Sequence, residues 1–171
     1  MAVRQLVLYP EPILRKVSKE VNSLNEEIFT LVADLKETLL AEQGLGLAAP
    51  QIGVAKRVFV FRRKLIDGEI VQEVINPVLE LRGRTIDSEE GCLSIPDFRE
   101  VIKRRSVAVL RGIDLNGNDI LLELEGLEAR CAQHELDHLN GVLFIDHFTI
   151  PQKLLFNEWV EKQEWFKLKN K

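Results

Sequence analysis

The chain has 171 residues, of which 46% are hydrophobic and 29% charged, and its formal net charge is −4. This length fits one domain, and the apolar fraction is too high for a disordered chain. Two cysteines can form one disulfide at most, which excludes a secreted protein stabilised by several disulfides. The net negative charge argues against a protein whose whole surface binds nucleic acid. No apolar run approaches the roughly 18–20 residues of a membrane helix, and the first residues show no signal-peptide pattern. We therefore expect a soluble, single-domain protein from a reducing compartment.

The first third of the chain predicts an extended segment, one helix and a loop of small residues. Residues 1–22, punctuated by two prolines, are expected to be extended. Ser23 and Glu26 form a capping-box pattern that predicts a helix start. Apolar residues then recur at helical spacing until Gly44; they are Ile28, Leu31, Val32, Leu35 and Leu39. Segment 44–51 has neither a helical nor a strand period.

From residue 57 onward the pattern predicts strands joined by short turns, followed by two helices. Apolar runs flank Asp67-Gly68 and Asn116-Gly117, which are hairpin-turn signals; the runs are 58–61, 70–75, 107–110 and 120–124. Asn76-Pro77 is expected to break the second run, which resumes at 78–81. A helix is predicted over 127–140, with Gly141 just past its end.

Pro151 is expected to open a last amphipathic helix over about 151–168. Its candidate packing residues are Leu154, Leu155, Trp159 and Phe166. A helix, many strands and further helices predict an α+β fold rather than an alternating α/β fold. We expect one compact domain over 1–171, with antiparallel or mixed β-sheets around the helix at 127–140.

The most specific feature is the segment His-Glu-Leu-Asp-His at 134–138. Histidines four residues apart lie on one helix face, about 6 Å apart along the axis, and can bind one metal ion together. Glu135, just after the first histidine, has the position of a general base acting on water at such an ion. The segment therefore predicts a metal-binding helix with hydrolytic chemistry.

A helical wheel places Leu127 and Cys131 on the stripe that holds His134 and His138. This arrangement favours a metal site inside a cleft with an apolar pocket beside it. Asp137 lies on the polar stripe and has two interpretations: a solvated charge, or a side chain that supports a metal ligand through a hydrogen bond.

A catalytic metal site usually has a third protein ligand and one open position. The candidates are Cys92, Cys131, His147, Glu158 and Glu161. Cys131 lies about 10 Å from His138 along the axis of the same helix, too far for its short side chain to share a metal ion with both histidines. We therefore interpret it as a pocket-lining or core thiol. His147 does not fit the zinc-peptidase spacing, and no motif supports a downstream glutamate. Cys92 follows two glutamates, which would raise the pKa of its thiol unless a metal cation reverses that effect; the alternative is an ordinary strand-end cysteine.

Three segments together resemble the peptide deformylases, bacterial and organellar enzymes that remove the formyl group from N-formylmethionine. These segments are 44–51 (Gly-Leu-Gly-Leu-Ala-Ala-Pro-Gln), 90–94 (Glu-Gly-Cys-Leu-Ser) and 133–138 (Gln-His-Glu-Leu-Asp-His), in the family's order. The resemblance covers essentially the whole chain. The long C-terminal helix resembles the form typical of Gram-negative bacteria.

The resemblance implies a role for each matching residue. Cys92, His134 and His138 would bind the metal, Glu135 would be general base and acid, and Gln51 with the N–H of Leu93 would bind the oxyanion. The substrate-binding residues would be Leu45, Gly46, Gly91, Arg99, Leu127 and Cys131. The alternative interpretation of Arg99 is a charged residue at the edge of a strand. Ser88 and Arg130 stand where some members have apolar residues, so we expect a more polar pocket mouth.

The resemblance also implies one divalent metal ion, typically Fe²⁺ in the cell, with Zn²⁺, Ni²⁺ or Co²⁺ as substitutes in purified protein. The substrate would be an N-formylmethionyl peptide in the bacterial cytoplasm, with no membrane partner and no sequence-specific nucleic acid. Residues 151–171 hold five lysines and three glutamates. This local excess of positive charge suits transient ribosome docking through the C-terminal helix, or a simple solvated tail.

Two other functions fit the histidine motif. A zinc endopeptidase uses the same His-Glu-x-x-His helix with a different third ligand. A structural metal module would need four protein ligands and no catalytic role for Glu135.

Overall fold

The apolar run at 58–61 forms part of a strand and is buried on both faces. The computed structural model describes residues 2–169. It contains one antiparallel sheet in the order β1-β2-β3-β4-β5, and the strands are Gly46–Ala48, Val58–Leu65, Gly68–Cys92, Ile95–Ile113 and Asp119–Glu125. Phe59 and Phe61 of β2 face helix α2 (Gly126–Leu139), while Val58 and Val60 face helix α1 (Glu26–Ala41). The predicted α+β fold is confirmed.

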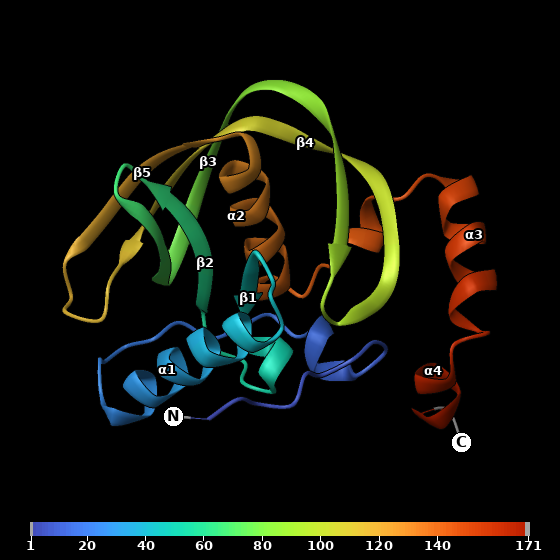
Figure 1. Cartoon of the computed structure of the whole chain (residues 1–171), viewed down its shortest axis with the longest axis horizontal. Helices are drawn as coiled ribbons and strands as arrows, with labels where there is room; N and C mark the ends of the chain where they lie inside the picture. Colours follow the sequence, from blue (N-terminus) through green and yellow to red (C-terminus); the bar gives the residue numbers. More distant parts are fainter. Residues whose placement is uncertain (1, 170–171) are drawn as a thin grey trace.

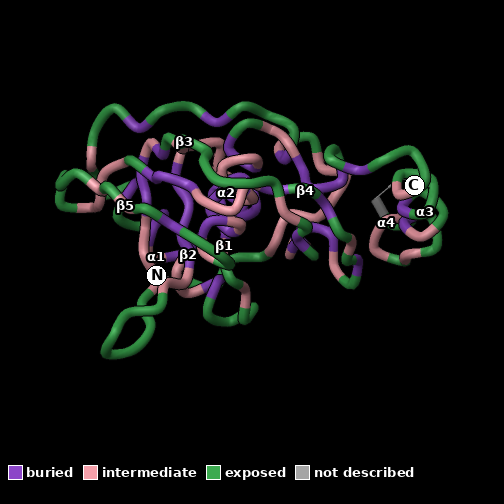
Figure 2. Tube along the Cα trace, turned by 90° about the horizontal axis from the view of Figure 1, so that it is seen from above, coloured by how far each residue is buried: buried purple, intermediate pink, exposed green. Residues whose placement is uncertain are grey.

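Helix α2 lies in the middle of the molecule, beneath the arch of β3 and β4 (Figure 1). Figure 2 shows that the buried part of the trace gathers around α2 and the strands beside it. Ala129, Ala132 and Leu139 pack this helix against the sheet. The neighbouring stripe of the same helix is therefore packed in the core, and this packing fixes the position of the stripe that carries the histidines.

The start of the first helix differs from the sequence prediction. The N-cap is Asn25 rather than Ser23, because the Asn25 side chain accepts a hydrogen bond from the N–H of Ile28 at 3.2 Å. Two capping residues lie close together in the sequence, and the chain uses the second of them. The segment 44–51, for which no period was visible, contains the short strand β1 and the start of a 3-10 helix, Ala49–Ile52.

Strand β3 runs through Asn76-Pro77 instead of ending there. The pairing of β3 with β4 shifts register between Ile75 and Val78, and Asn76 has a φ of 51°. The Asn76 side chain bonds the backbone N–H and C=O of Val21, each at 2.9 Å. This side chain fixes the bulge, so that β3 continues to Cys92 and its hairpin with β4 carries Cys92 to α2.

The predicted single C-terminal helix over about 151–168 is instead two helices, α3 (Ile150–Val160) and α4 (Glu164–Lys169). Leu154 and Leu155, expected to pack, are 60% and 54% exposed. The buried residues of this region are Phe156 and Val160. The break between the helices lets the chain turn back, so that Phe166 stacks on Tyr9 at a ring-centroid distance of 6.0 Å.

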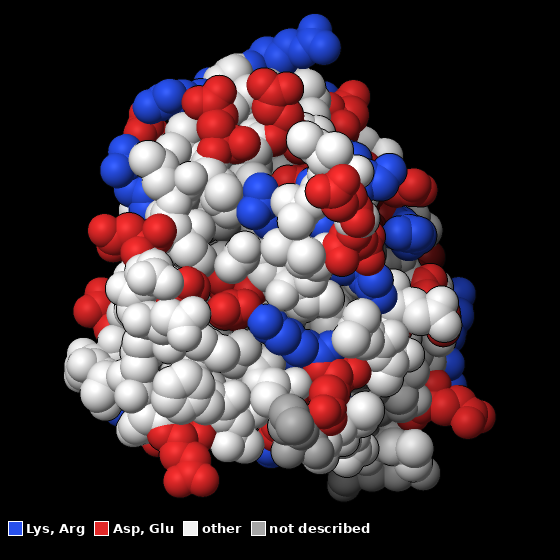
Figure 3. Space-filling view, turned by 60° about the vertical axis from the view of Figure 1, so that its left-hand side comes forward, with Lys and Arg blue, Asp and Glu red and all other residues white. Residues whose placement is uncertain are grey.

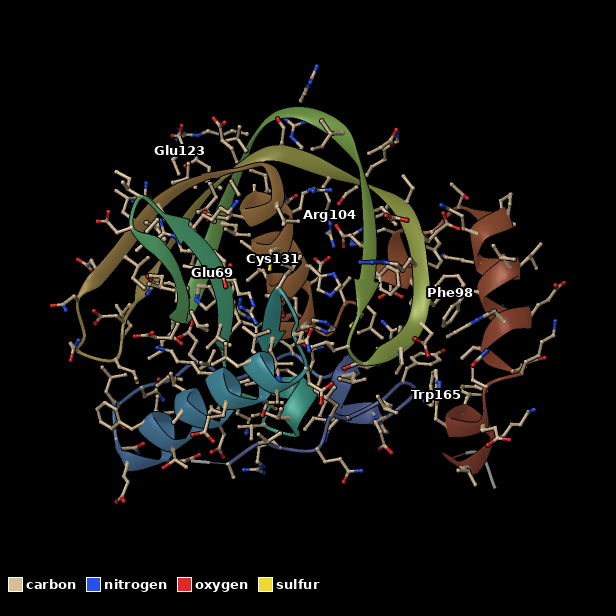
Figure 4. The ribbon with its side chains drawn as sticks, in the orientation of Figure 1. Glu69, Phe98, Arg104, Glu123, Cys131 and Trp165 are labelled. Atoms are coloured by element: carbon tan, nitrogen blue, oxygen red, sulfur yellow. The ribbon has the colours of Figure 1, made fainter. Side chains whose placement is uncertain are left out.

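The C-terminal helices pack through aromatic rings against the outer part of β4. Figure 4 shows Phe98 on β4 pointing toward α3, and Trp165 near α4. The ring of Phe98 lies 4.8 Å from that of Trp159. None of the helices described within residues 2–169 is long and apolar enough to cross a membrane. On the face in Figure 3, basic and acidic side chains lie beside one another rather than in one basic patch.

Candidate metal centre

Cys92, His134 and His138 meet at one point between β3 and α2. One ligand atom from each of the three lies within 4.8 Å of the others. The Cys92 Sγ is 3.3 Å from the Nε2 of His138, and the two imidazole rings are 4.9 Å apart between centroids. Cys92 and His138 are buried, and the side chain of His134 is 11% exposed. A thiolate and two imidazoles are a donor set that binds Zn²⁺, Fe²⁺ or related ions and leaves a further position open.

Each of the three side chains is positioned by regular structure. The histidines lie one turn apart on α2, as their spacing predicts. Cys92 is the last residue of β3, before the tight turn at Leu93 and Ser94 that leads into β4. The site is thus built on a helix and a hairpin end, which hold their geometry better than long loops do.

His134 is oriented by a buried carboxylate. Its Nδ1 lies 2.9 Å from Oε2 of Glu90, so an N–H there donates to Glu90 and leaves Nε2 for a metal. Arg104 holds the same carboxylate with two N–H groups at 2.9 and 3.0 Å, and the Ser88 hydroxyl donates to it at 3.0 Å. Burial alone would raise the pKa of Glu90, but the hydrogen bonds from His134 and Arg104 lower it to about 2. Glu90 is therefore an anion.

Arg104 extends this network toward the surface. Its Nη1 donates to Oδ2 of Asp137 at 2.7 Å, and the Nε2 of His147 lies 2.8 Å from the same oxygen. Figure 4 shows Arg104 between α2 and the arch of β3 and β4. The side chain of Asp137 is only 21% exposed. Of its two interpretations, the structure supports the hydrogen-bonding one, acting through Arg104 and Glu90 on His134.

Glu135 lies beside the three candidate ligands and has the properties of a proton carrier. It is 3% exposed, and its Oε2 has no hydrogen-bond partner within residues 2–169. Burial raises the pKa of Glu135 to about 7. A carboxyl group with this pKa can both accept and return a proton near neutral pH. An unpartnered buried oxygen also fits a water molecule or substrate group at the site.

Gln51 approaches the centre from the 3-10 helix that follows β1. Its Oε1 accepts from the N–H of Ala48 at 2.9 Å, which fixes the orientation of the amide. Its Nε2 then points to Cys92 Sγ at 3.5 Å and Ser94 Oγ at 3.2 Å. Leu93 follows Cys92 directly in the hairpin turn. The Gln51 amide and the residue Leu93 therefore both lie on the Cys92 side of the centre.

A cleft of about 530 Å³ opens beside the candidate metal centre. It is lined by every other residue singled out as substrate-binding or catalytic, namely Leu45, Gly46, Gln51, Gly91, Leu93, Arg99, Leu127, Cys131 and Glu135. Gly46 is a site of close approach, because a Cβ there would lie 2.7 Å from Cys131 Sγ and would collide with Glu135. Ser88 and Arg130 line the same cleft, so its wall is partly polar.

The alternative third ligands do not reach the metal centre within residues 2–169. Cys131 faces Gly46 in the cleft, and His147 bonds Asp137. Glu158 and Glu161 lie exposed on or just after α3. Cys92 is the candidate that completes the group with the two histidines. The three-residue donor set and the unpartnered Glu135 oxygen fit a catalytic rather than a closed structural metal site.

Comparison with known proteins agrees with this geometry. The family model described as "Polypeptide deformylase" matches residues 3–153. The chain belongs to this family. A peptide deformylase of Acidothermus cellulolyticus is 43% identical over 165 residues, which cover 96% of this chain and 89% of that protein. Peptide deformylase 1 of Clostridium perfringens is 45% identical over 148 residues, or 86% of this chain and 99% of that protein.

Solved peptide deformylase structures have the same fold. A crystal structure from Ehrlichia chaffeensis superposes with a TM-score of 0.86 at 34% identity, covering 95% of this chain and 97% of that one. The structure of the Ehrlichia chaffeensis enzyme in complex with actinonin gives a TM-score of 0.87 at 34% identity, covering 96% and 99%. The single domain with a five-stranded antiparallel sheet is therefore the deformylase fold.

Sequence reasoning missed two residues of this deformylase site, Glu90 as the partner of His134 and Arg104 as the partner of Glu90. The first had a usable signal. Residues i and i+2 of a strand face the same side, so Glu90 points where Cys92 points. Arg104 had no such signal, because it lies in the charged run Lys103-Arg104-Arg105, of which only the middle side chain is buried.

Proposed function

We propose that this chain removes the formyl group from the N-terminal formylmethionine of newly made polypeptides and releases formate. Membership of the polypeptide deformylase family supports this function. The observation that carries it is the convergence of Cys92, His134 and His138 beside the buried Glu135, at one end of a peptide-sized cleft.

Cys92, His134 and His138 would hold one divalent ion, and we propose Fe²⁺ in the cell, with Zn²⁺, Ni²⁺ or Co²⁺ able to replace it in purified protein. Affinity alone favours Zn²⁺ over Fe²⁺, so the resident metal depends on availability and geometry. When bound, the ion polarises the formyl carbonyl and makes a water molecule nucleophilic near neutral pH.

Glu135 is proposed to move the proton. It takes a proton from the attacking water and delivers it to the leaving amine, and a pKa of about 7 suits both steps. The Nε2 of Gln51 and the N–H of Leu93 would donate to the oxyanion that develops on the former formyl oxygen. Donors of this kind contribute about 2.7–4 kcal/mol each to transition-state stabilisation.

The peptide is proposed to bind as an added strand in the cleft. Within residues 2–169, strand β1 pairs only with β2, so one of its edges is open beside Leu45 and Gly46. Gly91 and Arg99, paired on β3 and β4, line the cleft as well. Backbone pairing of this kind accepts many sequences, because it uses the main chain and not the side chains. The first side chain would enter the pocket of Leu45, Leu127 and Cys131.

We also propose a cellular setting for this reaction. Both cysteines are free, which suits the reducing cytoplasm of a bacterium. The exposed lysines and the exposed Leu154 and Leu155 around α3 suit transient docking on the ribosome, near the emerging substrate.

One assay tests the proposed reaction. The protein is purified without oxygen and loaded with Fe²⁺, or reloaded with Ni²⁺ or Co²⁺, and formate release is followed from a formyl-Met peptide beside its acetyl-Met analogue. The proposal predicts formate from the first and no deacetylation of the second. Release from neither contradicts the proposal.

A further inference from the structure

The cleft has a polar corner that the proposed reaction does not use. Arg130 on α2 and Ser88 on β3 line it from opposite sides, next to the apolar Leu127 and Cys131. Arg130 lies about one helical turn before His134 along α2. Arg130, Leu127 and Cys131 therefore line the same cleft as His134 and Glu135.

Arg130 has hydrogen-bonding capacity to spare. Its Nη1 contacts the Ser88 hydroxyl oxygen at 3.3 Å, and its Nε contacts the carbonyl of Gly126 at 3.4 Å. Both contacts are longer than a normal N–H···O bond, and a guanidinium has five N–H groups. No carboxylate within residues 2–169 forms an ion pair with Arg130, whereas Arg104 is paired with both Glu90 and Asp137.

The hydrogen-bond donors and charges of this corner determine which chemical class of side-chain group can bind there. The Ser88 hydroxyl already donates to Glu90, so the corner offers N–H donors from Arg130 and no second free donor from Ser88. Glu89 also lines the cleft, and its charge would disfavour an anionic side chain. A neutral, strong acceptor at the end of a methionine-shaped side chain meets all of these conditions.

We propose that Arg130 makes this enzyme accept peptides that begin with formylmethionine sulfoxide, by donating a hydrogen bond to the sulfoxide oxygen. The inference rests on the proposed deformylase function and adds a second substrate to it. Oxidation adds one oxygen to the thioether and turns the side chain polar and chiral. An apolar pocket would leave that oxygen unpaired, whereas this pocket provides it with a charged donor.

The test compares kcat/KM for three peptides on the metal-loaded enzyme: formyl-Met-Ala-Ser and its two purified sulfoxide epimers. We expect the better epimer to react within about tenfold of the methionine peptide, because its oxygen is paired. The other epimer should be clearly slower, since one guanidinium on one wall reaches only one of the two oxygen positions. Both epimers reacting more than about tenfold slower than methionine overturns the proposal.

Three variants locate the effect. In Arg130→Leu the ratio of sulfoxide to methionine kcat/KM should fall about tenfold or more, and the epimer preference should disappear. Arg130→Lys keeps a charged donor and should retain the preference. Arg82→Leu removes an exposed arginine of β3 far from the cleft and should leave the ratio unchanged. An unchanged ratio in Arg130→Leu overturns the proposal.

Three further outcomes remain distinguishable. If formyl-Glu-Ala-Ser reacts faster than either sulfoxide, the corner selects carboxylates and the proposed ligand class is wrong. If even formyl-Met-Ala-Ser yields no formate, the proposed deformylase function itself fails. If Arg130→Leu does not fold, as judged by its thermal unfolding, the epimer preference of the unmodified enzyme still decides the matter.

Discussion

Glu90 should control how tightly the site holds its metal, although it is not among the candidate ligands. The variant Glu90→Gln keeps the shape of the side chain and removes its charge. In the native chain this carboxylate accepts four hydrogen bonds, from His134, Ser88 and both Nε and Nη2 of Arg104, at 2.9–3.0 Å. A glutamine presents one acceptor oxygen, and its amide nitrogen faces donors that it cannot accept from.

Two costs follow from these contacts. Loss of the oriented acceptor for His134 should weaken metal affinity about 10–100-fold, as is usual for such supporting carboxylates. Breaking a buried ion pair typically costs about 3–5 kcal/mol of unfolding free energy. Asp137 still neutralises Arg104 here, so we expect the lower end of that range.

The assay is a competition titration of Co²⁺ between the protein and a chelator, together with urea unfolding of the metal-free protein. Glu123→Gln on β5 is the matched control, because that carboxylate is 63% exposed and its nearest cation is 3.8 Å away. The control should match the native chain in both measurements. Native-like metal affinity and stability in Glu90→Gln would refute the reasoning that Glu90 holds His134 in place.

Three further substitutions test the chemistry and the packing. Glu135→Gln should keep the metal and lower kcat by about 10²–10⁴, whereas full turnover would exclude Glu135 as the general base. Gln51→Leu should lower kcat by about 10²–10³, and an unchanged rate would exclude Gln51 from the oxyanion site. The Asp34 carboxylate accepts hydrogen bonds from the N–H of Ala2 at 2.9 Å and from the Arg4 side chain at 3.0 Å. Burial raises the pKa of Asp34, but these hydrogen bonds outweigh it and lower the pKa below its usual value. Asp34→Asn should therefore cost about 1 kcal/mol of unfolding free energy near neutral pH. The loss should vanish as the pH falls through the lowered pKa of Asp34 in the folded state, because the stabilisation exists only above it; a pH-independent difference in urea unfolding would contradict this.

The parts of the fold that sequence predicts well have local signals. The helix predicted over 127–140 has apolar spacing, paired histidines and a glycine just past its end, and α2 spans Gly126–Leu139, within one residue of that prediction. The turn between β4 and β5 contains Asn116-Gly117, whose backbone preference fixes it. Each feature depends on neighbours a few residues away.

The remaining features depend on contacts between distant segments. Asn76-Pro77 looks like a strand end, yet the strand continues because Val21, more than fifty residues earlier, holds Asn76 in a bulge. The C-terminal helix has no proline or glycine at 161–163, and it breaks where Phe166 turns back onto Tyr9. The Arg104–Glu90 pair joins two strands whose register no local pattern reveals.

The most direct test of the metal centre compares two cysteine variants. Cys92→Ser and Cys131→Ser both remove a buried thiol, and only Cys92 meets the two histidines. Under anaerobic titration with Co²⁺, Cys131→Ser should bind one ion per chain and show a thiolate-to-metal absorption band, as the native protein should. Cys92→Ser should lose the band and most of the affinity. Equal Co²⁺ binding by Cys92→Ser, with the band retained, would contradict the account.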